Sequence, residues 1–598
     1  MTMAADQLAA RLEKLSRLRA EGIDPYPYRY ERTHTTGDLE KNFDTLAQAA
    51  TVVKTFGRLM LWRKMGKSTF GHIQDQAGRF QIFLNHDTMG EAAYTRWTKN
   101  LDIADIIGVS GTLFTTKTGE KSLRVTELTM LCKSLHNLPD KQHGYTNEEL
   151  RQRHREMDIL VNEDSRRAFL MRSKIVTTAR QLMVEHGYSE VDVPVLQTVY
   201  GGAEARPFTT HVQAIDTDVY LSIAPETYLK RYLVGGFDRA YFIGKNFRNE
   251  GIDRTHHPEF SCFEGYAAGM DYNDLMVLVE TLISQIALRV TGSTQVEYHG
   301  QKIELKPPWR RIRMMEALRE KLGTDPMALS QAECERLLKE ANVEFEPKLA
   351  KGYLLLKLFD HHFEAGLIQP AFVMDYPEET SPLCKPHRTV PGLIERFEGY
   401  LNGWEICNCY SELNDPQLQR KLLERQVRML EAGLEQGTPM DEDFAFAIEL
   451  GMPPTGGFGI GLDRICMLLS GARAIQDVLA YPLLRPSQGR QVEDESSAAA
   501  IEGGAAESGA TGTAAPGALP ADALAALHKV IERVLLKQNK KADALTDADI
   551  ADLAPIVCNV ARKKGGLPAP LETMLADDTK PLIPIVAGIL KAFPKAAP

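Results

Sequence analysis

The sequence predicts an α+β protein in which a small β-barrel precedes a larger domain built on an antiparallel sheet. The chain has 598 residues, too many for one hydrophobic core, so several domains are expected. Residues 51–140 contain five short β-rich segments separated by Gly or Asp turns, a pattern typical of a small barrel. Residues 155–486 begin with a long amphipathic helix and then mix strands and helices without regular βαβ alternation, which favours an antiparallel sheet.

Further segments accompany these two domains. Residues 1–50 form an N-terminal helical extension, because leucines recur at helical spacing near its start. A helical insert is expected at about 310–365. Residues 487–520 lack aromatic side chains and are rich in Ala, Gly and Ser, which predicts a flexible linker. Residues 521–598 regain helical periodicity and predict a small helical tail of unknown role.

The composition is that of an ordinary globular protein, with 43% hydrophobic and 25% charged residues. No apolar run is long enough to cross a bilayer. The N-terminus carries Asp6, Glu13 and Glu21 and lacks an apolar segment, so it resembles neither a signal nor a transit peptide, and we expect a cytoplasmic protein with no membrane partner. The net charge of −10 means that a nucleic-acid partner requires a local basic surface. The 8 cysteines form no C-x-x-C pair, which favours reduced thiols over disulfides or a metal site.

The first candidate site is the charged stretch "NFRNEGIDRTHHPEFSCFEGY" at 246–266, which reads as two strands joined by a loop. Period 2 places Arg248 and Glu250 on one face of the first strand. One face of the second strand carries Phe260, Cys262, Glu264 and Tyr266. A matching ligand would carry a phosphate, a flat ring and a cation. The alternative is a solvated charged hairpin, which would include Arg254 and His257.

The second candidate site is a hairpin whose turn is Asn402-Gly403. A regular two-residue turn pairs Glu398 with Cys407 and makes Glu398 and Glu405 diagonal neighbours, roughly 7–8 Å apart at the Cα level. Two carboxylates this close repel each other unless a cation lies between them, and oxygen ligands suit Mg²⁺. The alternative is an exposed acidic rim. Period 2 places three further residues opposite Glu405, so a β-bulge is needed if they serve the same pocket: Asn408, Tyr410 and Glu412.

The third candidate site is "GGFGIGLDRICMLLSG" at 456–471. Its glycines allow close approach of the backbone, and Arg464 lies near the start of the following helix, where N–H groups favour anions. The alternative is a surface arginine. "MGKST" at 65–69 lacks the earlier glycine of a phosphate-binding loop, and 456–464 lacks the third glycine of a dinucleotide fingerprint, so we reject both.

These sites resemble the signature motifs of class II aminoacyl-tRNA synthetases. "YSEVDVPVL" after the long helix is similar to motif 1, "FRNEG…HHPEF" to motif 2 and "GFGIGLDR" to motif 3. "GGAEARPF", "IAPETYLKR" and "EICNCYSELND" are similar to the lysine-specific members, and the resemblance covers 1–486. It implies an OB-fold anticodon-binding barrel, a homodimer, and ATP-dependent ligation of L-lysine to lysine tRNA through a lysyl-adenylate, with AMP and pyrophosphate released.

The resemblance also implies residue roles. Arg248 and Arg464 would be the catalytic arginines on the phosphates of ATP, and Mg²⁺ would be held by Glu398 and Glu405. The ATP-binding residues would be Arg248, Glu250, His256, Phe260 and Arg464. The lysine-binding residues would be Gly202, Glu226, Glu264, Tyr266, Asn408, Tyr410 and Glu412. The anticodon-binding residues would be Phe70, Gln81 and Glu120. Phosphate attraction near the anticodon would come from Arg58, Arg63 and Lys64.

Several alternatives remain open at this point. Phe70 could be a core aromatic residue, and Trp404 departs from the Arg or Lys that we expect in the family just before Glu405. A synthetase paralogue that lysylates a protein is one rival function, although such relatives usually lack the barrel. A non-catalytic RNA-binding protein on the same scaffold is another. It would be free to lose residues that are all present here, namely Arg248, Glu398, Glu405 and Arg464.

Overall fold

The computed structural model describes residues 2–139, 145–434 and 437–485. The predicted linker and helical tail at 487–598 lie outside these residues. The chain begins with helix α1 (Thr2–Ala20), as the leucine spacing predicts. Helices α2 (Thr36–Lys41) and α3 (Phe43–Gln48) follow, and a reciprocal capping box between Thr35 and Asp38 starts α2.

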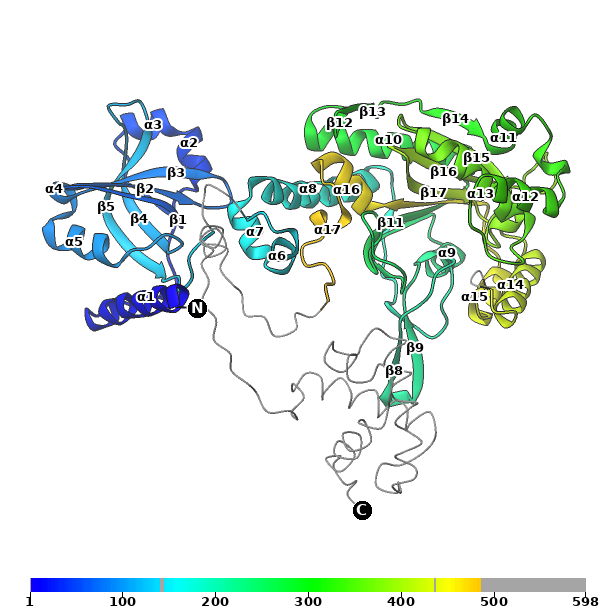
Figure 1. Ribbon diagram of the computed structural model, residues 1–598, viewed down its shortest axis with the longest axis horizontal. Coiled ribbons are helices and arrows are strands. Elements are labelled where there is room, and N and C mark those ends of the chain that lie inside the picture. The colour runs from blue at the N-terminus through cyan, green and yellow to red at the C-terminus, as the bar shows by residue number, and fades with distance from the viewer. Residues whose placement is uncertain (1, 140–144, 435–436, 486–598) are drawn as a thin grey trace, which may run out of the picture. The chain divides into compact units, whose positions relative to one another are not determined.

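The first domain is a closed five-stranded barrel with the strand order β1-β2-β3-β5-β4 (Figure 1). Its strands are β1 (Val53–Met65), β2 (Ser68–Gln74), β3 (Arg79–Asn85), β4 (Ile106–Thr115) and β5 (Lys121–Cys132). Helices α4 (His86–Met89) and α5 (Glu91–Asn100), which the sequence did not predict, connect β3 to β4. The predicted barrel and its five strands are confirmed.

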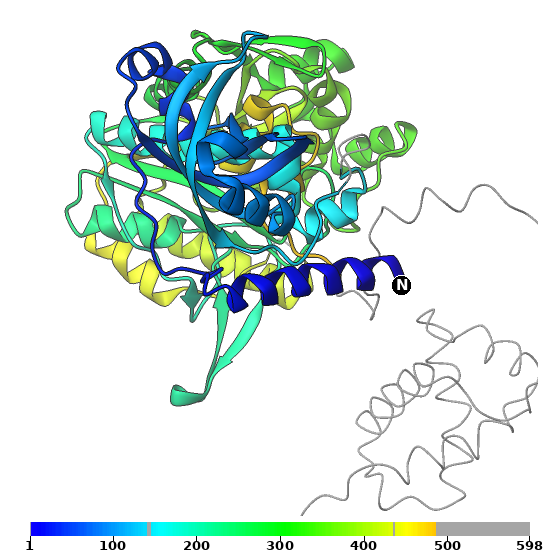
Figure 2. The ribbon, with the colours of Figure 1, turned by 90° about the vertical axis from the view of Figure 1, so that its left-hand side faces the viewer.

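Alternation along the strands separates the barrel's interior from its surface. Figure 2 shows the ribbon of the barrel, in blue, turned by 90° from the view of Figure 1. In β3, Phe80, Ile82 and Leu84 are buried in the barrel core, whereas Gln81 and Phe83 are half-buried on the outer face. Phe70 lies directly opposite Phe83 on β2 and is also half-buried. Phe70 is therefore not a core aromatic residue.

The second domain is built on an eight-stranded sheet with the order β14-β15-β16-β17-β18-β11-β10-β6 (Figure 1). The two outermost pairs, β14 with β15 and β10 with β6, are parallel, and the inner pairs are antiparallel. The strands are β6 (Ser189–Glu190), β10 (Arg239–Phe247), β11 (Glu259–Ala268), β14 (Arg310–Arg313), β15 (Ala371–Pro377), β16 (Leu393–Leu401), β17 (Trp404–Ser411) and β18 (Thr455–Gly461).

The predicted helical insert starts later than expected. Residues 310–313 pair with β15 as the edge strand β14, so they belong to the sheet. The helices that follow are α11 (Met314–Leu322), α12 (Gln331–Glu340) and α13 (Lys351–Phe363). A short run of four residues with three arginines carries no clear strand periodicity, so only its pairing partner reveals it.

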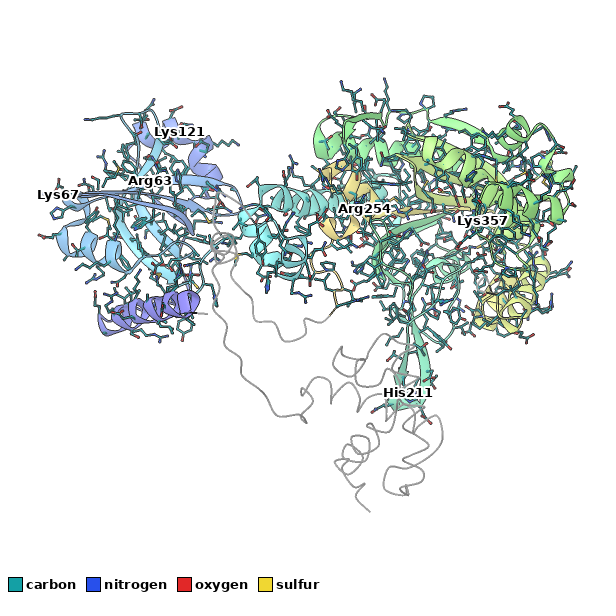
Figure 3. The ribbon with its side chains drawn as sticks, in the orientation of Figure 1. Arg63, Lys67, Lys121, His211, Arg254 and Lys357 are labelled. Atoms are coloured by element: carbon teal, nitrogen blue, oxygen red, sulfur yellow. The ribbon has the colours of Figure 1, made fainter. Side chains whose placement is uncertain are left out.

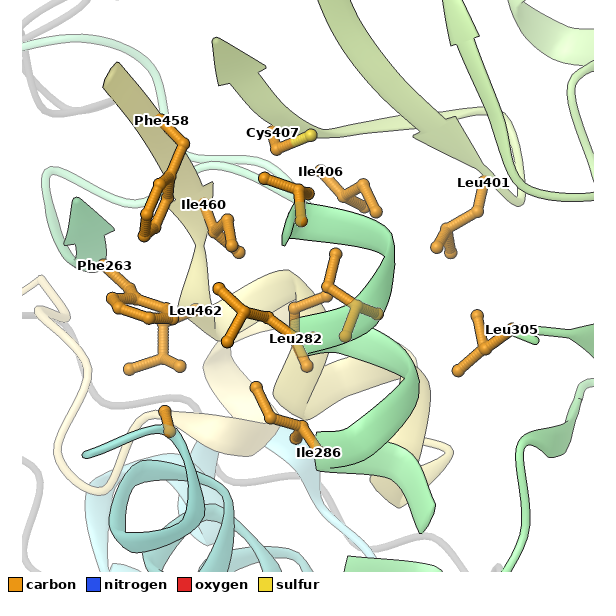
Figure 4. Close-up of a cluster of buried hydrophobic side chains, with 14 of the residues drawn as sticks. Phe263, Leu282, Ile286, Leu305, Leu401, Ile406, Cys407, Phe458, Ile460 and Leu462 are labelled. Carbon is orange, nitrogen blue, oxygen red and sulfur yellow. The ribbon is translucent and has the colours of Figure 1, made fainter. Parts of the chain in front are cut away.

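Hydrophobic cores cover both faces of the sheet. On one face, Phe263, Phe458 and Ile460 of the strands pack against Leu282 of α10 (Tyr272–Thr291) and Leu462 of α16 (Figure 4). This core also includes α8, and the opposite core includes α9, α11, α12, α13 and α15. The bounds of these helices are α8 (Glu163–Glu185), α9 (Glu226–Val234), α15 (Glu442–Leu450) and α16 (Leu462–Ser470).

Smaller elements complete the described part of the chain. Helices α6 (Glu148–Arg153) and α7 (Arg155–Val161) precede α8, while α14 (Pro416–Glu431) and α17 (Ile475–Val478) lie later in the domain. The short strands are β7 (Leu196–Gln197), β8 (Thr209–Val212), β9 (Thr217–Leu221), β12 (Gln295–Tyr298) and β13 (Gln301–Glu304). The seven cysteines within the described ranges are all free thiols. Among the same residues, no helix has the length and apolarity that a membrane span requires.

Candidate active site on one face of the sheet

A pocket of about 490 Å³ opens on the face of the sheet opposite to the core shown in Figure 4. This volume is within the usual range for the site of a small-molecule ligand. Its floor is formed by that face of β10, β11, β16, β17 and β18. The predicted residues that line it are Gly202, Glu226, Arg248, Glu250, His256, Phe260, Glu264, Tyr266, Glu398, Glu405, Asn408, Tyr410 and Arg464.

A β-bulge in β17 brings the residues of the second hairpin to the same pocket. Tyr400 pairs with Glu405, but Gly399 pairs with Cys407, so Ile406 is the extra residue. Glu398 therefore lies opposite Asn408, and the predicted pairing of Glu398 with Cys407 is wrong. The bulge places Glu405 on the same face of the sheet as Asn408. The sequence predicted that a bulge would be needed if both residues serve one pocket.

Glu398 is held by a dense set of hydrogen bonds. The hydroxyl groups of Tyr376 and Tyr400 donate to its Oε2 at 2.9 and 2.6 Å, and the Arg396 guanidinium donates to its Oε1. Burial, and then the charge of Glu398, raise the pKa of Glu405. Burial and Glu398 also raise the pKa of Asp360, on α13, to about 8. Glu398 pairs with Arg396, and Glu405 lies 3.6 Å from Arg464, but these arginines do not cancel the rise in the pKa of Glu405.

Trp404 does not reach this pocket. It pairs with Leu401 and packs against the core on the opposite face of the sheet. Its ring centroid lies 5.2 Å from that of Tyr298 on β12. The departure from a basic residue at this position therefore leaves the side chains around Glu405 in place.

The basic end of the pocket contains Arg464, His256 and Arg248. The Arg464 guanidinium donates to the backbone carbonyl of Glu405 and lies 3.2 Å from His256 Nε2. Arg248 Cζ lies 5.0 Å from the ring centroid of Phe260, in the range of a cation–π contact. Both arginines line the open pocket, where an anionic group can reach them.

The predicted alternative of a solvated hairpin applies to only part of the loop. Arg254 is exposed, and Figure 3 shows its position. His257 is buried: its Nδ1 lies 2.6 Å from the carbonyl of Glu259, and the N–H of Leu483 donates to its Nε2 at 3.0 Å. His257 therefore holds the loop against the end of the domain and is not solvated.

The acidic end of the pocket contains Glu226, Glu264 and Glu412. Burial and the nearby charge of Glu226 raise the pKa of Glu264 to about 8. The Tyr266 hydroxyl lies 3.4 Å from Glu264 Oε2, and Glu264 forms no ion pair within the described residues. Glu412 is 1% exposed and lies behind the lining residues, so it is next to the pocket and not on its surface.

Sequence reasoning missed Lys230, which lies between two of these carboxylates. Lys230 is completely buried, and its Nζ lies 2.6 Å from Glu226 Oε1 and 2.5 Å from Glu412 Oε2. Burial alone would lower the pKa of Lys230, but the two carboxylates outweigh it and raise that pKa, so the side chain is an ammonium. The spacing of Glu226 and Lys230, one helical turn apart, was the signal available in the sequence.

Arg396 was also missed. It donates through Nε to Asn408 Oδ1 at 3.0 Å and through a terminal nitrogen to the carbonyl of Thr380 at 3.0 Å, and it contacts Glu398. Arg396 thus joins a predicted lysine-binding residue to a predicted metal ligand. Its position two residues before Glu398 on one strand places it on the same face, which period 2 could have revealed.

The barrel carries a half-buried aromatic cluster on its outer face, at the predicted anticodon positions. The ring centroids of Phe70 and Phe83 are 4.9 Å apart, those of Phe83 and Phe114 are 5.5 Å apart, and Arg124 Cζ lies 4.6 Å from the Phe114 centroid. Gln81 donates to the hydroxyl of Ser122 at 2.6 Å, and Glu120 is exposed in the loop before β5.

The barrel also carries basic side chains, of which Arg124 and Arg63 adjoin this cluster. Arg63 pairs with Phe70 across β1 and β2 and is exposed, as is Lys64. Figure 3 shows Arg63, Lys67 and Lys121 projecting from the barrel. Arg58 instead donates to the carbonyl of Ala104 at 2.8 Å, so it is part of the barrel's internal bonding.

Two family models match the chain. One, described as tRNA synthetases class II (D, K and N), matches residues 147–485, and an OB-fold nucleic acid binding domain matches residues 53–131. A lysine–tRNA ligase of Clostridium botulinum (strain Langeland) is 43% identical over 493 residues, which cover 82% of this chain and 97% of the relative. A lysine–tRNA ligase of Clostridium perfringens (strain ATCC 13124) is 44% identical over 489 residues, covering 81% and 97%. The chain belongs to the lysine–tRNA ligase family of class II aminoacyl-tRNA synthetases.

Proposed function

We propose that this enzyme activates L-lysine with ATP to form a lysyl-adenylate and then transfers the lysyl group to lysine tRNA. The observation that carries this proposal is the polarity of the pocket. One end collects the carboxylates Glu226 and Glu264, and the other end collects Arg248 and Arg464 beside Glu405. A cationic amino acid and a nucleoside triphosphate suit these two ends of one cavity.

ATP would lie along the basic end. Phe260, which is in cation–π contact with Arg248, would stack on adenine. Glu250, exposed at the pocket mouth, would accept a hydrogen bond from the adenine amino group. Arg464 and His256, which are neighbours, would bind the outer phosphates.

Mg²⁺ is the proposed metal. Glu398 and Glu405 fit it because both are carboxylates on the pocket face, and because the charge of Glu398 raises the pKa of Glu405. Within the described residues, no group of three or more His, Cys, Asp or Glu side chains could hold a metal by itself. Phosphate oxygens of ATP would therefore complete the coordination. When bound, the metal would offset charge on the phosphates of ATP.

Lysine would lie along the acidic end. Glu264, which has no ion-pair partner among the described residues, would receive the ε-ammonium, with Tyr266 and the free oxygen of Glu412 beside it. Glu226 and the backbone of Gly202 would receive the α-ammonium, and Tyr410 would pack on the methylene groups. Asn408, which is oriented by Arg396, would complete the subsite.

The chemistry then needs little proton transfer. The lysine carboxylate attacks the α-phosphorus in line, a P–O bond forms, and pyrophosphate leaves while Arg248 stabilises the charge on the α-phosphate. Arg464 and His256 orient the leaving pyrophosphate. The 3′-hydroxyl of the terminal tRNA adenosine then attacks the carbonyl carbon of the adenylate, and AMP leaves.

The proposed function also implies a tRNA anticodon, a second subunit and a cellular location. The aromatic and basic outer face around Phe70 would bind the unpaired anticodon bases, with Gln81 and Glu120 as hydrogen-bonding groups. A homodimer is supported by exposed apolar side chains near the motif 1 segment, including Val184 and Leu196, which are 68% and 52% exposed. A cytoplasmic location agrees with the free thiols in the described part of the chain.

Pyrophosphate exchange tests the proposal. We expect ATP–pyrophosphate exchange with lysine and with none of the other standard amino acids at comparable kcat/KM. Glu405→Gln is the inactive control and should lower exchange by about 100-fold, because it removes a negative ligand from the metal. Exchange that depends on asparagine or aspartate would overturn the assignment.

The tRNA step separates this enzyme from its rivals. Charging of a lysine-accepting tRNA is expected, and a paralogue that lysylates a protein would show exchange without charging. A non-catalytic RNA-binding protein would show neither reaction.

A further inference from the structure

Lys230 lies at the junction of the two proposed ammonium subsites. Its Nζ contacts one oxygen of Glu226 and one oxygen of Glu412, at 2.6 and 2.5 Å. The rings of Tyr410 and Phe444 enclose the same nitrogen, with centroids 5.5 and 5.8 Å away. No part of Lys230 is exposed, so its ammonium is a fixed component of the protein and not a ligand for solvent or substrate.

Each of these carboxylates keeps a second oxygen. Glu412 Oε1 is buried and has no hydrogen-bond partner within the described residues. It points toward Gly457, which lines the pocket, and an added Cβ there would collide with it. Glu226 itself lines the pocket. An unpaired buried carboxylate oxygen is costly, so the position next to Glu412 Oε1 favours a cation.

We propose that Lys230 is a specificity-determining positioning residue, which sets the separation between the carboxylates that receive the α- and ε-ammonium groups and so selects a diamino acid of the length of lysine. This inference rests on the proposed roles of Glu226 and Glu412. Glu226 lies on helix α9 and Glu412 just after strand β17, so without a common cation their mutual repulsion would move them apart. Lys230 fixes both in one geometry.

The experiment compares lysine with ornithine, which is shorter by one methylene, in pyrophosphate exchange. In Lys230→Met, we expect kcat/KM for lysine to fall by about 100-fold, because the two buried carboxylates lose their cation. The ratio of kcat/KM for lysine to that for ornithine should fall by about tenfold, since one methylene is usually worth at least that much discrimination. A thermal melt establishes that the variant is folded.

Lys133 in the barrel provides a matched control. It is also fully buried, and its Nζ lies 2.6 Å from Asp102 and 2.8 Å from Asp105. Lys133→Met removes the same kind of ammonium from the same kind of site, so it should lower the melting temperature without changing the lysine-to-ornithine ratio. A purely structural role of Lys230 would give the same result for both variants.

A second variant covers the case in which Lys230→Met does not fold. Lys230→Arg keeps the positive charge but presents a longer, planar group, so the ratio should still change while the pH dependence of KM for lysine stays as in the wild type. An unchanged ratio in whichever variant is folded would overturn the inference. If the wild-type enzyme itself shows no lysine-dependent exchange, the proposed function fails instead.

Discussion

The carboxyl group of Glu264 has an environment that favours its neutral form until a cation arrives. Burial and the charge of Glu226 raise its pKa to about 8, whereas the same group in the unfolded chain would titrate near its ordinary value. Arg248 and Lys230 lower the pKa of Glu264 but do not reverse this rise. The substrate ammonium would therefore bind in exchange for a proton on Glu264.

The pH dependence of binding follows from this exchange. We expect KM for lysine to fall as the pH rises from 6.5 toward about 8 and to level off above it, because less free energy is then needed to deprotonate Glu264. Pyrophosphate exchange across this range is the measurement. A flat profile would show that Glu264 is already ionised in the free enzyme.

The stability effect has a defined sign. Because the folded-state pKa of Glu264 is raised, the folded protein binds more protons than the unfolded chain between the two pKa values, and stability falls as pH rises through that interval. Glu264→Gln should therefore weaken the pH dependence of the melting temperature while lowering lysine-dependent exchange by about 100-fold. The exposed Glu297 on β12 supplies the control, since Glu297→Gln should change neither quantity.

At the level of elements, strand β18 forms the floor between the two carboxylate-bearing strands β11 and β17. Its residues facing the pocket are Gly457, Gly459 and Gly461, while Phe458 and Ile460 face the opposite core. A Cβ at position 457 would collide with Glu412 Oε1 and with the ring of Tyr266. At position 459 the nearest atom would be Glu264 Cγ, at an ordinary 3.5 Å.

These contacts predict different outcomes for two alanine substitutions on β18. Gly457→Ala should lower kcat/KM for lysine by roughly tenfold or more and cost about 1–3 kcal/mol of stability, because Glu412 and Tyr266 must move. Gly459→Ala should lose much less in both measurements. Equal losses in exchange kinetics and thermal melts would show that the contacts of position 457 with Glu412 and Tyr266 do not determine the cost of the added methyl group.

The sequence predicted the hairpin formed by β16 and β17 but not the position of the bulge within it. Turn chemistry at Asn402-Gly403 correctly predicted the hairpin and the pairing of Tyr400 with Glu405. It could not place the bulge at Ile406, because a one-residue insertion depends on packing against β18 and leaves no local signature. The strands that bear the pocket residues were predictable from the alternation of side chains between the two faces of a strand.

For Lys230, the sequence indicates only the contact with Glu226, which lies one helical turn away. Its second partner, Glu412, is distant in sequence, and only the fold brings the two together. A lysine in an amphipathic helix is expected to be exposed to solvent, whereas Lys230 is fully buried. The strand β14 was missed similarly, since its pairing with β15 is parallel and non-local.

At the scale of the whole molecule, amino-acid activation and tRNA selection are assigned to different domains. The pocket belongs to the eight-stranded sheet, and the aromatic cluster belongs to the barrel. Each domain has its own hydrophobic core, so a substitution on the surface of one should leave the chemistry of the other intact.

Phe70→Ala tests this division. We expect kcat/KM for tRNA charging to fall by about 10- to 100-fold, because one base loses its stacking partner, while lysine-dependent exchange stays at the wild-type rate. Tyr28→Ala removes a fully exposed aromatic ring elsewhere on the chain and should leave charging unchanged. Unaltered charging in Phe70→Ala would move the anticodon-binding face away from this cluster.

The glycine floor of β18 has a consequence for redesign of the enzyme. Because the residues of that strand that face the cavity are glycines, we expect the identity of the accepted amino acid to depend on side chains of the flanking strands and of helix α9. The arginines proposed to bind the phosphates, Arg248 and Arg464, lie elsewhere in the cavity. Libraries that randomise the acidic cluster while keeping the three glycines should therefore change which monomer enters translation without rebuilding the nucleotide half of the catalyst.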